Sequence, residues 1–277
     1  MPSFTGKTFS NFYKNIFGIN QSSNTGVDAT TRAVQDGAGN NTSISLSDDV
    51  LSVQPNTDNT TGTMLVKNKS GSNIFSVDTT NSKLLGGASQ TALNTQYAHF
   101  GVGSVDATWA GSLADTHYAV PFANLASTAA SSAIANLAMG SSTSSSFNDT
   151  NPATSLTIAS TAMDMVATYW YVIDNITIDS VIWLHAADTA TGESTAAHLM
   201  AYDFNASGSS TGGDLSNGVV AADGSNITNA GYEQIYYQSM TVQSADVDAG
   251  SVILFIFASD TVNSDYTINA TVKYHIR

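Results

Sequence analysis

The C-terminal end of the chain carries the clearest pattern of apolar and polar residues. Between Tyr266 and Ile276 every second residue is apolar or aromatic, and the residues between them are Thr, Asn, Lys and His. Successive side chains of a β-strand point to opposite faces, so this alternation predicts a strand over 265–277 with one buried face.

Six further segments of the C-terminal half are rich in β-branched and aromatic residues and are separated by Gly, Asn, Asp and Ser. They cover residues 156–163, 167–173, 176–187, 196–204, 235–242 and 251–259. Such a series of strands without intervening helices predicts an all-β antiparallel sandwich, most simply a jelly roll, as a head domain over 152–277. The apolar runs 181–184 and 252–257 predict central strands covered on both faces, by the chain itself or by a neighbouring subunit.

The N-terminal segment has the spacing of a short amphipathic helix. Its apolar residues recur at positions i, i+3, i+4, i+7 and i+8, and they are Phe9, Phe12, Tyr13, Ile16 and Phe17. A helix of about ten residues is unstable alone in water, so this stripe must dock, either on its own domain or on another subunit. The Gly, Asn and Ser residues of 18–26 favour another subunit, because they are typical of a tether. Residues 1–35 are therefore predicted to be an anchoring arm.

The segments between arm and head are shorter and less regular. Residues 36–87 alternate over only a few positions at a time, which predicts a small β strip. So little apolar area makes an isolated sheet marginal, so the strip is expected to pair with neighbours or with copies of itself, most simply in a homotrimer. Residues 88–151 are interpreted as a connecting region, in which the Ser/Ala-rich stretch 125–146 predicts a short helix followed by a loop.

Charge divides the chain differently from hydrophobicity. From Leu84 to Val272 there is no Lys or Arg, whereas sixteen of the 22 acidic residues lie there. Binding to nucleic acid or to an anionic membrane draws its affinity from basic side chains, so neither is expected as a partner. The same absence removes the usual side chains for binding phosphoryl or carboxylate substrates.

Cysteine is absent, which excludes disulfides and thiolate-bound zinc. The N-terminus has no apolar core behind a basic start, and no stretch approaches the roughly 18 apolar residues of a membrane span. We therefore expect a soluble protein without a Sec-type signal, and no cofactor.

One loop has the spacing of a calcium site. Asp203, Asn205 and Ser207 stand at positions 1, 3 and 5 of a twelve-residue stretch that has Gly at position 6 and ends at Asp214. It lacks flanking helices and a final Glu, and Gly/Ser/Asp loops are frequent in this composition. A plain connection between strands is therefore favoured over a calcium site.

Signals for catalysis are weak. The five histidines show no pair at ligand spacing, no G-x-S-x-G motif occurs, and the chain has only two glutamates. Tyr169, Tyr171 and Trp183, together with Trp170, could stack on sugar rings. Because they alternate between strand faces, at least half of these aromatic residues are expected to be core. No catalytic residue is assigned, and the protein is interpreted as a non-enzyme.

Two N-terminal segments resemble virion structural proteins of tailed phages of marine bacteria. They are 31–40 (TRAVQDGAGN) with 42–47 (TSISLS), and 65–78 (LVKNKSGSNIFSVD), which is similar to the short strand-turn-strand units of phage fibre and decoration proteins. Residues 247–254 (VDAGSVIL) are similar to jelly-roll heads of such proteins. The resemblance covers about the first ninety residues, and it implies a trimeric particle component with an N-terminal anchor and a distal β domain.

These observations favour a non-enzymatic component at the surface of a virion. The absence of a long shaft or repeat array favours a capsid decoration or cement protein that binds other virion proteins through its arm. The alternative is a short tail fibre or spike whose head binds a cell-surface glycan. A secreted carbohydrate-active protein is a third interpretation, which the absent secretion signal disfavours.

Overall fold

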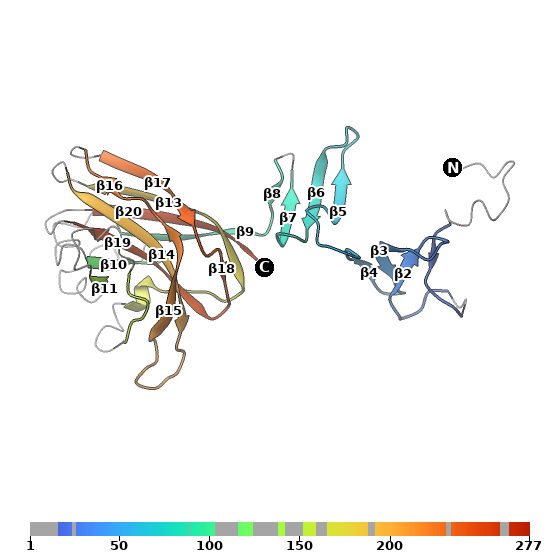
Figure 1. Cartoon of the computed structure of the whole chain (residues 1–277), viewed down its shortest axis with the longest axis horizontal. Helices are drawn as coiled ribbons and strands as arrows, with labels where there is room; N and C mark the ends of the chain where they lie inside the picture. Colours follow the sequence, from blue (N-terminus) through green and yellow to red (C-terminus); the bar gives the residue numbers. More distant parts are fainter. Residues whose placement is uncertain are drawn as a thin grey trace. The chain divides into compact units, whose positions relative to one another are not determined.

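The computed structural model describes residues 16–277 except 24–25, 88, 103–115, 124–137, 142–151, 159–164, 188–191, 231–233 and 261–265. The chain forms two units, 1–94 and 95–277, which are considered separately. Both are built from antiparallel strands (Figure 1). The all-β class predicted from the sequence is thus confirmed.

The C-terminal unit is a sandwich of two four-stranded layers. One layer has the order β9 (Thr95–Val102), β20 (Tyr266–Ile276), β13 (Ile176–Ala187), β17 (Gln234–Val242). The other has the order β10 (Thr116–Val120), β19 (Ser251–Ser259), β14 (Ser194–Phe204), β15 (Leu215–Asp223). Short strands extend these layers: β11 (Ala138–Ser141), β12 (Trp170–Tyr171), β16 (Ile227–Thr228) and β18 (Asp246–Val247).

The order of these eight strands is that of a jelly roll. Counted along the chain, the first layer contains strands one, eight, three and six, and the second contains two, seven, four and five. The layers join where Ala222 of β15 pairs with Val242 of β17. They also meet at the opposite side, where Phe100 of β9 bridges Phe122. The predicted jelly roll is therefore confirmed, although its predicted start is wrong.

The head begins at Thr95 rather than at residue 152. β9 pairs along eight residues with the C-terminal strand β20, and β10 pairs with β19. Both strands lie in the segment interpreted as a connecting region, and β11 lies within its Ser/Ala-rich stretch. The residues of the helix predicted there, 125–137, lie outside the described residues. The partners β20 of β9 and β19 of β10 are more than a hundred residues away in the sequence, so local periodicity could not reveal these pairings.

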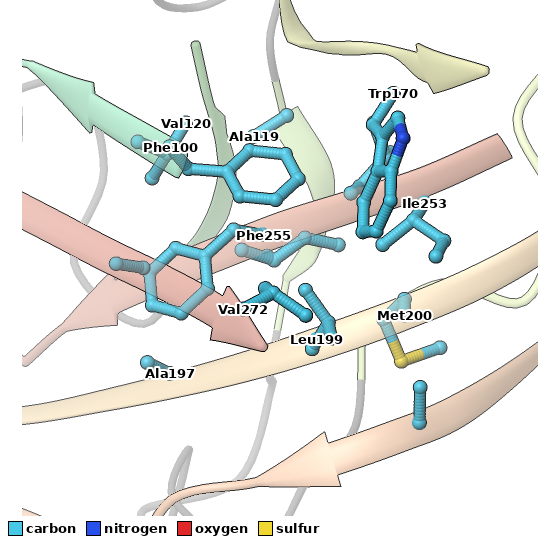
Figure 2. Close-up of a cluster of buried hydrophobic side chains, with 14 of the residues drawn as sticks. Phe100, Ala119, Val120, Trp170, Ala197, Leu199, Met200, Ile253, Phe255 and Val272 are labelled. Atoms are coloured by element: carbon cyan, nitrogen blue, oxygen red, sulfur yellow. The ribbon is translucent and has the colours of Figure 1, made fainter. Parts of the chain in front are cut away.

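The head has one large apolar core between the two layers. Phe255 of β19 packs 6.1 Å from Phe100 of β9 and 6.4 Å from Trp183 of β13, measured between ring centroids. Figure 2 shows Phe100 and Phe255 with Leu199 and Val272 in this cluster. The inner residues of both layers are almost completely buried.

The outer faces of the two layers differ. The run 252–257 of β19 is buried on both faces, as predicted. Residues 152–158 cover part of this side, since the hydroxyl of Tyr202 donates to the carbonyl of Ala153 at 2.9 Å and Leu156 bridges Leu215. The run 181–184 of β13 is not covered on both faces by the chain itself, because Leu184 on the outer face of the first layer remains 37% exposed.

The N-terminal unit contains two small antiparallel sheets. The first has β1 (Gly18–Ile19), β2 (Arg32–Gln35), β3 (Asn41–Leu46) and β4 (Leu51–Val53), and the second has β5 (Met64–Lys67), β6 (Asn73–Asp78), β7 (Lys83–Gly86) and β8 (Thr91–Ala92). The predicted tether 18–26 thus starts with a strand, because Ile19 pairs with Val34. Among the described residues of 16–94, no apolar side chain is buried; only Ser76 and Asp78 are.

Candidate functional site

The candidate calcium loop is the connection of the β14–β15 hairpin. The side-chain amide of Asn217 donates to Asp203 Oδ2 at 2.7 Å, and the backbone N–H of Ile158 donates to Asp214 Oδ1 at 2.7 Å. Asn205 Oδ1 accepts from the N–H of Ser207 at 3.0 Å. The Ser207 hydroxyl donates to that of Ser209 at 2.8 Å. Each residue of the proposed ligand set therefore already has a partner within the protein.

The glycines of this loop have a folding role. A Cβ on Gly212 would lie 1.9 Å from the carbonyl oxygen of Ser207, and Gly213 has φ +98°. Both positions require the absence of a side chain for the loop to close. Within the described part of the chain, no group of three His, Cys, Asp or Glu side chains is arranged to hold a metal ion. The Gly/Ser/Asp pattern is accounted for by hairpin geometry.

A cavity of about 430 Å³ lies beside this hairpin loop. Its apolar side includes Ile158, Tyr169 and Phe204, and its polar side is the loop 205–209. The Tyr169 hydroxyl donates to the carbonyl of Gly213 at 3.1 Å, which ties the ring to the loop. Burial, followed by the negative charge of Asp214, raises the pKa of Tyr169 well above its usual range. The hydroxyl stays protonated and can act as a fixed donor.

The structure brings two of the three candidate glycan residues together. Phe204 contacts the ring of Tyr169 at 6.1 Å and that of Tyr171 at 5.6 Å, edge to face in both cases. Tyr171 is 48% exposed, so its ring is accessible to a sugar. Phe204 is the link between them, and sequence reasoning missed it because it is distant along the chain.

Trp183 does not belong to this surface, which corrects the sequence interpretation. It is fully buried and stacks on His185 with ring centroids 4.7 Å apart. Trp170 is also core, stacked on Phe122 at 5.9 Å. Two of the four aromatic residues are therefore core, in agreement with the expectation that at least half of them would be.

The predicted anchoring residues are only partly described. Phe9, Phe12 and Tyr13 lie outside the described residues. Ile16 and Phe17 are 39% and 65% exposed, and they precede strand β1 directly rather than ending a helix. Contrary to the prediction, these two positions are not helical, because the backbone leads directly into the pairing of β1 with β2.

Four buried histidines lie on strands of the head: His117, His185, His198 and His275. His185 stacks between Trp183 and Tyr236, whose ring is 5.2 Å away, and burial lowers its pKa to about 4. His117 and His198 approach to 5.2 Å between ring centroids. Burial, followed by the charge of His198, lowers the pKa of His117 to about 4. At neutral pH, His117 and His185 are therefore uncharged residues of the packed sheets.

A buried carboxylate joins three strand ends. Glu193, just before β14, accepts hydrogen bonds from the hydroxyl of Ser259 at 2.8 Å and from the hydroxyl of Tyr266. All three side chains are buried. Ser259 ends β19 and Tyr266 begins β20, so the cluster fixes the connection between neighbouring layers. It has the geometry of a structural clamp, in which the serine hydroxyl donates to the acid rather than to a histidine.

Comparison of the sequence with protein-family models and with curated proteins finds no match. In the part of the chain that the structure describes, none of the helical turns has the length or apolarity of a membrane-crossing helix.

Proposed function

We propose that the protein is a non-enzymatic structural component of a phage virion, a capsid decoration or cement protein that attaches through its N-terminal unit. One observation carries the attachment: the described residues of 16–94 form two sheets without a single buried apolar side chain. Such a unit is incomplete by itself, because buried apolar area is the main stabilising contribution to a fold. Covering by other subunits would supply it.

The exposed apolar residues of this unit are suited to docking. They occur on both sheets and include Leu51, Leu65, Ile74 and Leu93. A large apolar side chain contributes about 1.5–3 kcal/mol when fully buried, so each half-exposed one has about 1 kcal/mol left to gain. A few of them are sufficient for stable attachment.

The head has the opposite character and supports a role at the particle surface. It has its own core, and residues 95–277 contain sixteen acidic residues but only Lys273 and Arg277 as basic ones. Such a domain is repelled by packaged nucleic acid and is solvated well. The assignment to a virion rests on the N-terminal resemblance.

Binding of purified variants to particles that lack the protein tests this proposal. Leu51→Asp and Leu65→Asp should each weaken co-sedimentation with the particles, because a charge would have to be buried at the contact. Ile173→Asp is the matched control, since Ile173 is an exposed isoleucine of the head. Undiminished binding of both N-terminal variants, or equal loss in the control, contradicts attachment through this unit.

A second candidate, a tail fibre or spike head that binds a surface glycan, is favoured by the cavity beside Tyr169. Aromatic rings next to hydroxyl and amide groups are a suitable surface for a sugar. Tyr171→Ala should abolish binding of host-surface glycans to the protein, whereas Tyr97→Ala, which removes an exposed tyrosine of β9, should not. Absence of glycan binding by the unmodified protein refutes this candidate.

A further inference from the structure

The outer face of the β9–β20–β13–β17 layer is an open, mostly uncharged sheet surface. We propose that the heads of separate copies of this chain associate through this face. The inference does not depend on the virion role, since it concerns only how copies of the head contact one another.

Strand register gathers the apolar residues of this face into one patch. Leu184 of β13 lies opposite Tyr237 of β17, and Ala186 lies opposite Ile235. Tyr237 and Ile235 are 66% and 77% exposed. Paired and consecutive positions on one face lie within contact distance, so these side chains form a continuous surface. A flat patch with a central tyrosine has the composition of a protein contact.

The neighbouring strands continue the face mainly with uncharged hydrogen-bonding groups, and Lys273 of β20 is the basic residue on it. Thr271 of β20 lies opposite Ile182 of β13, and Asn269 lies opposite Leu184. The Nδ1 atom of His99 in β9 lies 3.2 Å from the Oγ1 atom of Thr271. The face therefore changes from apolar at β17 to hydroxyl and amide groups at β20, which fits an apolar centre with a polar rim.

The scarcity of acidic residues on this face favours a second copy of the head as its binding partner. The four strands of this layer contain one acidic residue, Asp179, in a head that contains sixteen. Its carboxylate lies 3.1 Å from the Nδ1 atom of buried His275, at a break in the register of β13 and β20. Two heads repel each other wherever acidic loops meet, and this face lets them approach without that cost. A basic partner would be drawn to the acidic loops instead.

The opposite layer offers no equivalent surface. Three of its strands are buried within the single chain. The buried residues are all of β10, Thr195 to Tyr202 of β14, and Val252 to Ser259 of β19. Of the two layers, only the first therefore has long central strands with an uncovered outer face, as the exposure of Leu184 shows. Association through the first layer would also cover the outer face of β13, as its apolar run 181–184 predicts.

The chain has no cysteine, so a single introduced thiol can place a probe at one position. We would make Tyr237→Cys in the full chain, attach benzophenone through a maleimide, and irradiate the purified protein at micromolar concentration. Val219→Cys, at an exposed position of β15 in the other layer, is the matched control. Benzophenone captures any nearby C–H group, so the result does not depend on the symmetry of the assembly.

We expect covalent dimers or trimers from position 237 and at least about fivefold less from position 219. Adding Ile235→Asp should lower the yield at 237 about tenfold, because it places like charges opposite each other. The proposal is overturned if position 237 gives no cross-linked copies, if 219 gives an equal yield, or if Ile235→Asp has no effect. Particle binding by the N-terminal variants is measured separately, so these failures leave the proposed function untouched.

Discussion

Acid should destabilise the head through His185, and replacing this residue should remove part of the effect. Burial lowers its pKa in the folded protein to about 4, whereas an unfolded histidine titrates near 6.5. The unfolded chain therefore takes up a proton more readily than the folded one. The stability that the neutral ring contributes is fully present above pH 6.5 and is lost as the pH falls towards 4.

The expected magnitude follows from the two pKa values. Their difference corresponds to about 3 kcal/mol once the pH is below 4, and about 2 kcal/mol of this is lost between pH 7 and pH 5. His185→Phe keeps a ring that can stack on Trp183 and Tyr236. It removes the contact of Nε2 with Thr195 Oγ1 at 3.3 Å, and Thr195 can still donate to the carbonyl of Ile227. A loss of about 1 kcal/mol is expected at pH 7.

Chemical unfolding followed by tryptophan fluorescence measures this effect, because all three tryptophans belong to the head. Between pH 7 and pH 5 the free energy of unfolding should fall by about 2 kcal/mol less in His185→Phe than in the unmodified protein. Carboxylates titrate in both proteins and cancel in the comparison. His99→Phe, at an exposed position of β9, should retain the original pH dependence. An equal pH dependence in His185→Phe and the unmodified protein would refute the reasoning.

Two further outcomes follow from the β14–β15 hairpin. Gly218→Ala should cost about 1–3 kcal/mol in the free energy of unfolding, because its Cβ would lie 2.4 Å from the ring of buried Tyr202, whereas Gly208→Ala meets no atom within 4 Å and should be nearly neutral. Millimolar calcium should leave the Tm unchanged, because the candidate ligands at 203–214 are already engaged. A calcium-dependent rise in Tm that Asp203→Asn abolishes would show instead that the loop opens to bind the ion.

Long strands with a strong apolar pattern were predictable from the sequence, whereas strands with a short or interrupted pattern were not. Strands β13 and β19 match the predicted segments 176–187 and 251–259. β15 was missed because Asn217 and Gly218 interrupt its apolar pattern. The predicted segment 167–173 is mainly a 3₁₀ turn at Val166–Thr168 followed by the two residues of β12. Here tertiary contacts with the hairpin and with β19 decide the backbone conformation rather than local propensity.

The candidate sites depend on contacts between distant residues, which one sequence does not reveal. Tyr169 and Tyr171 were identified by residue type, but only the fold shows that Phe204 joins them and that Trp183 faces the core. The partners of Glu193 lie 66 and 73 residues along the chain. The calcium pattern is a clear signal in the sequence with two possible meanings, because hairpin loops and calcium sites use the same types of residue.

The two units depend on different sources of stability, and this difference connects the fold to assembly. The head buries a large apolar core within one chain, so it can fold without a partner. The described part of 16–94 holds its strands by backbone pairing and turn contacts, such as the hydrogen bonds of Asp36 with Ala38 and Asn40, and leaves its apolar residues unburied. Under the proposed attachment, mass action gives this unit its remaining stability only when the partner is present. A head with its own core, in the same chain as a unit whose described residues form none, is therefore consistent with the proposed display on a larger assembly.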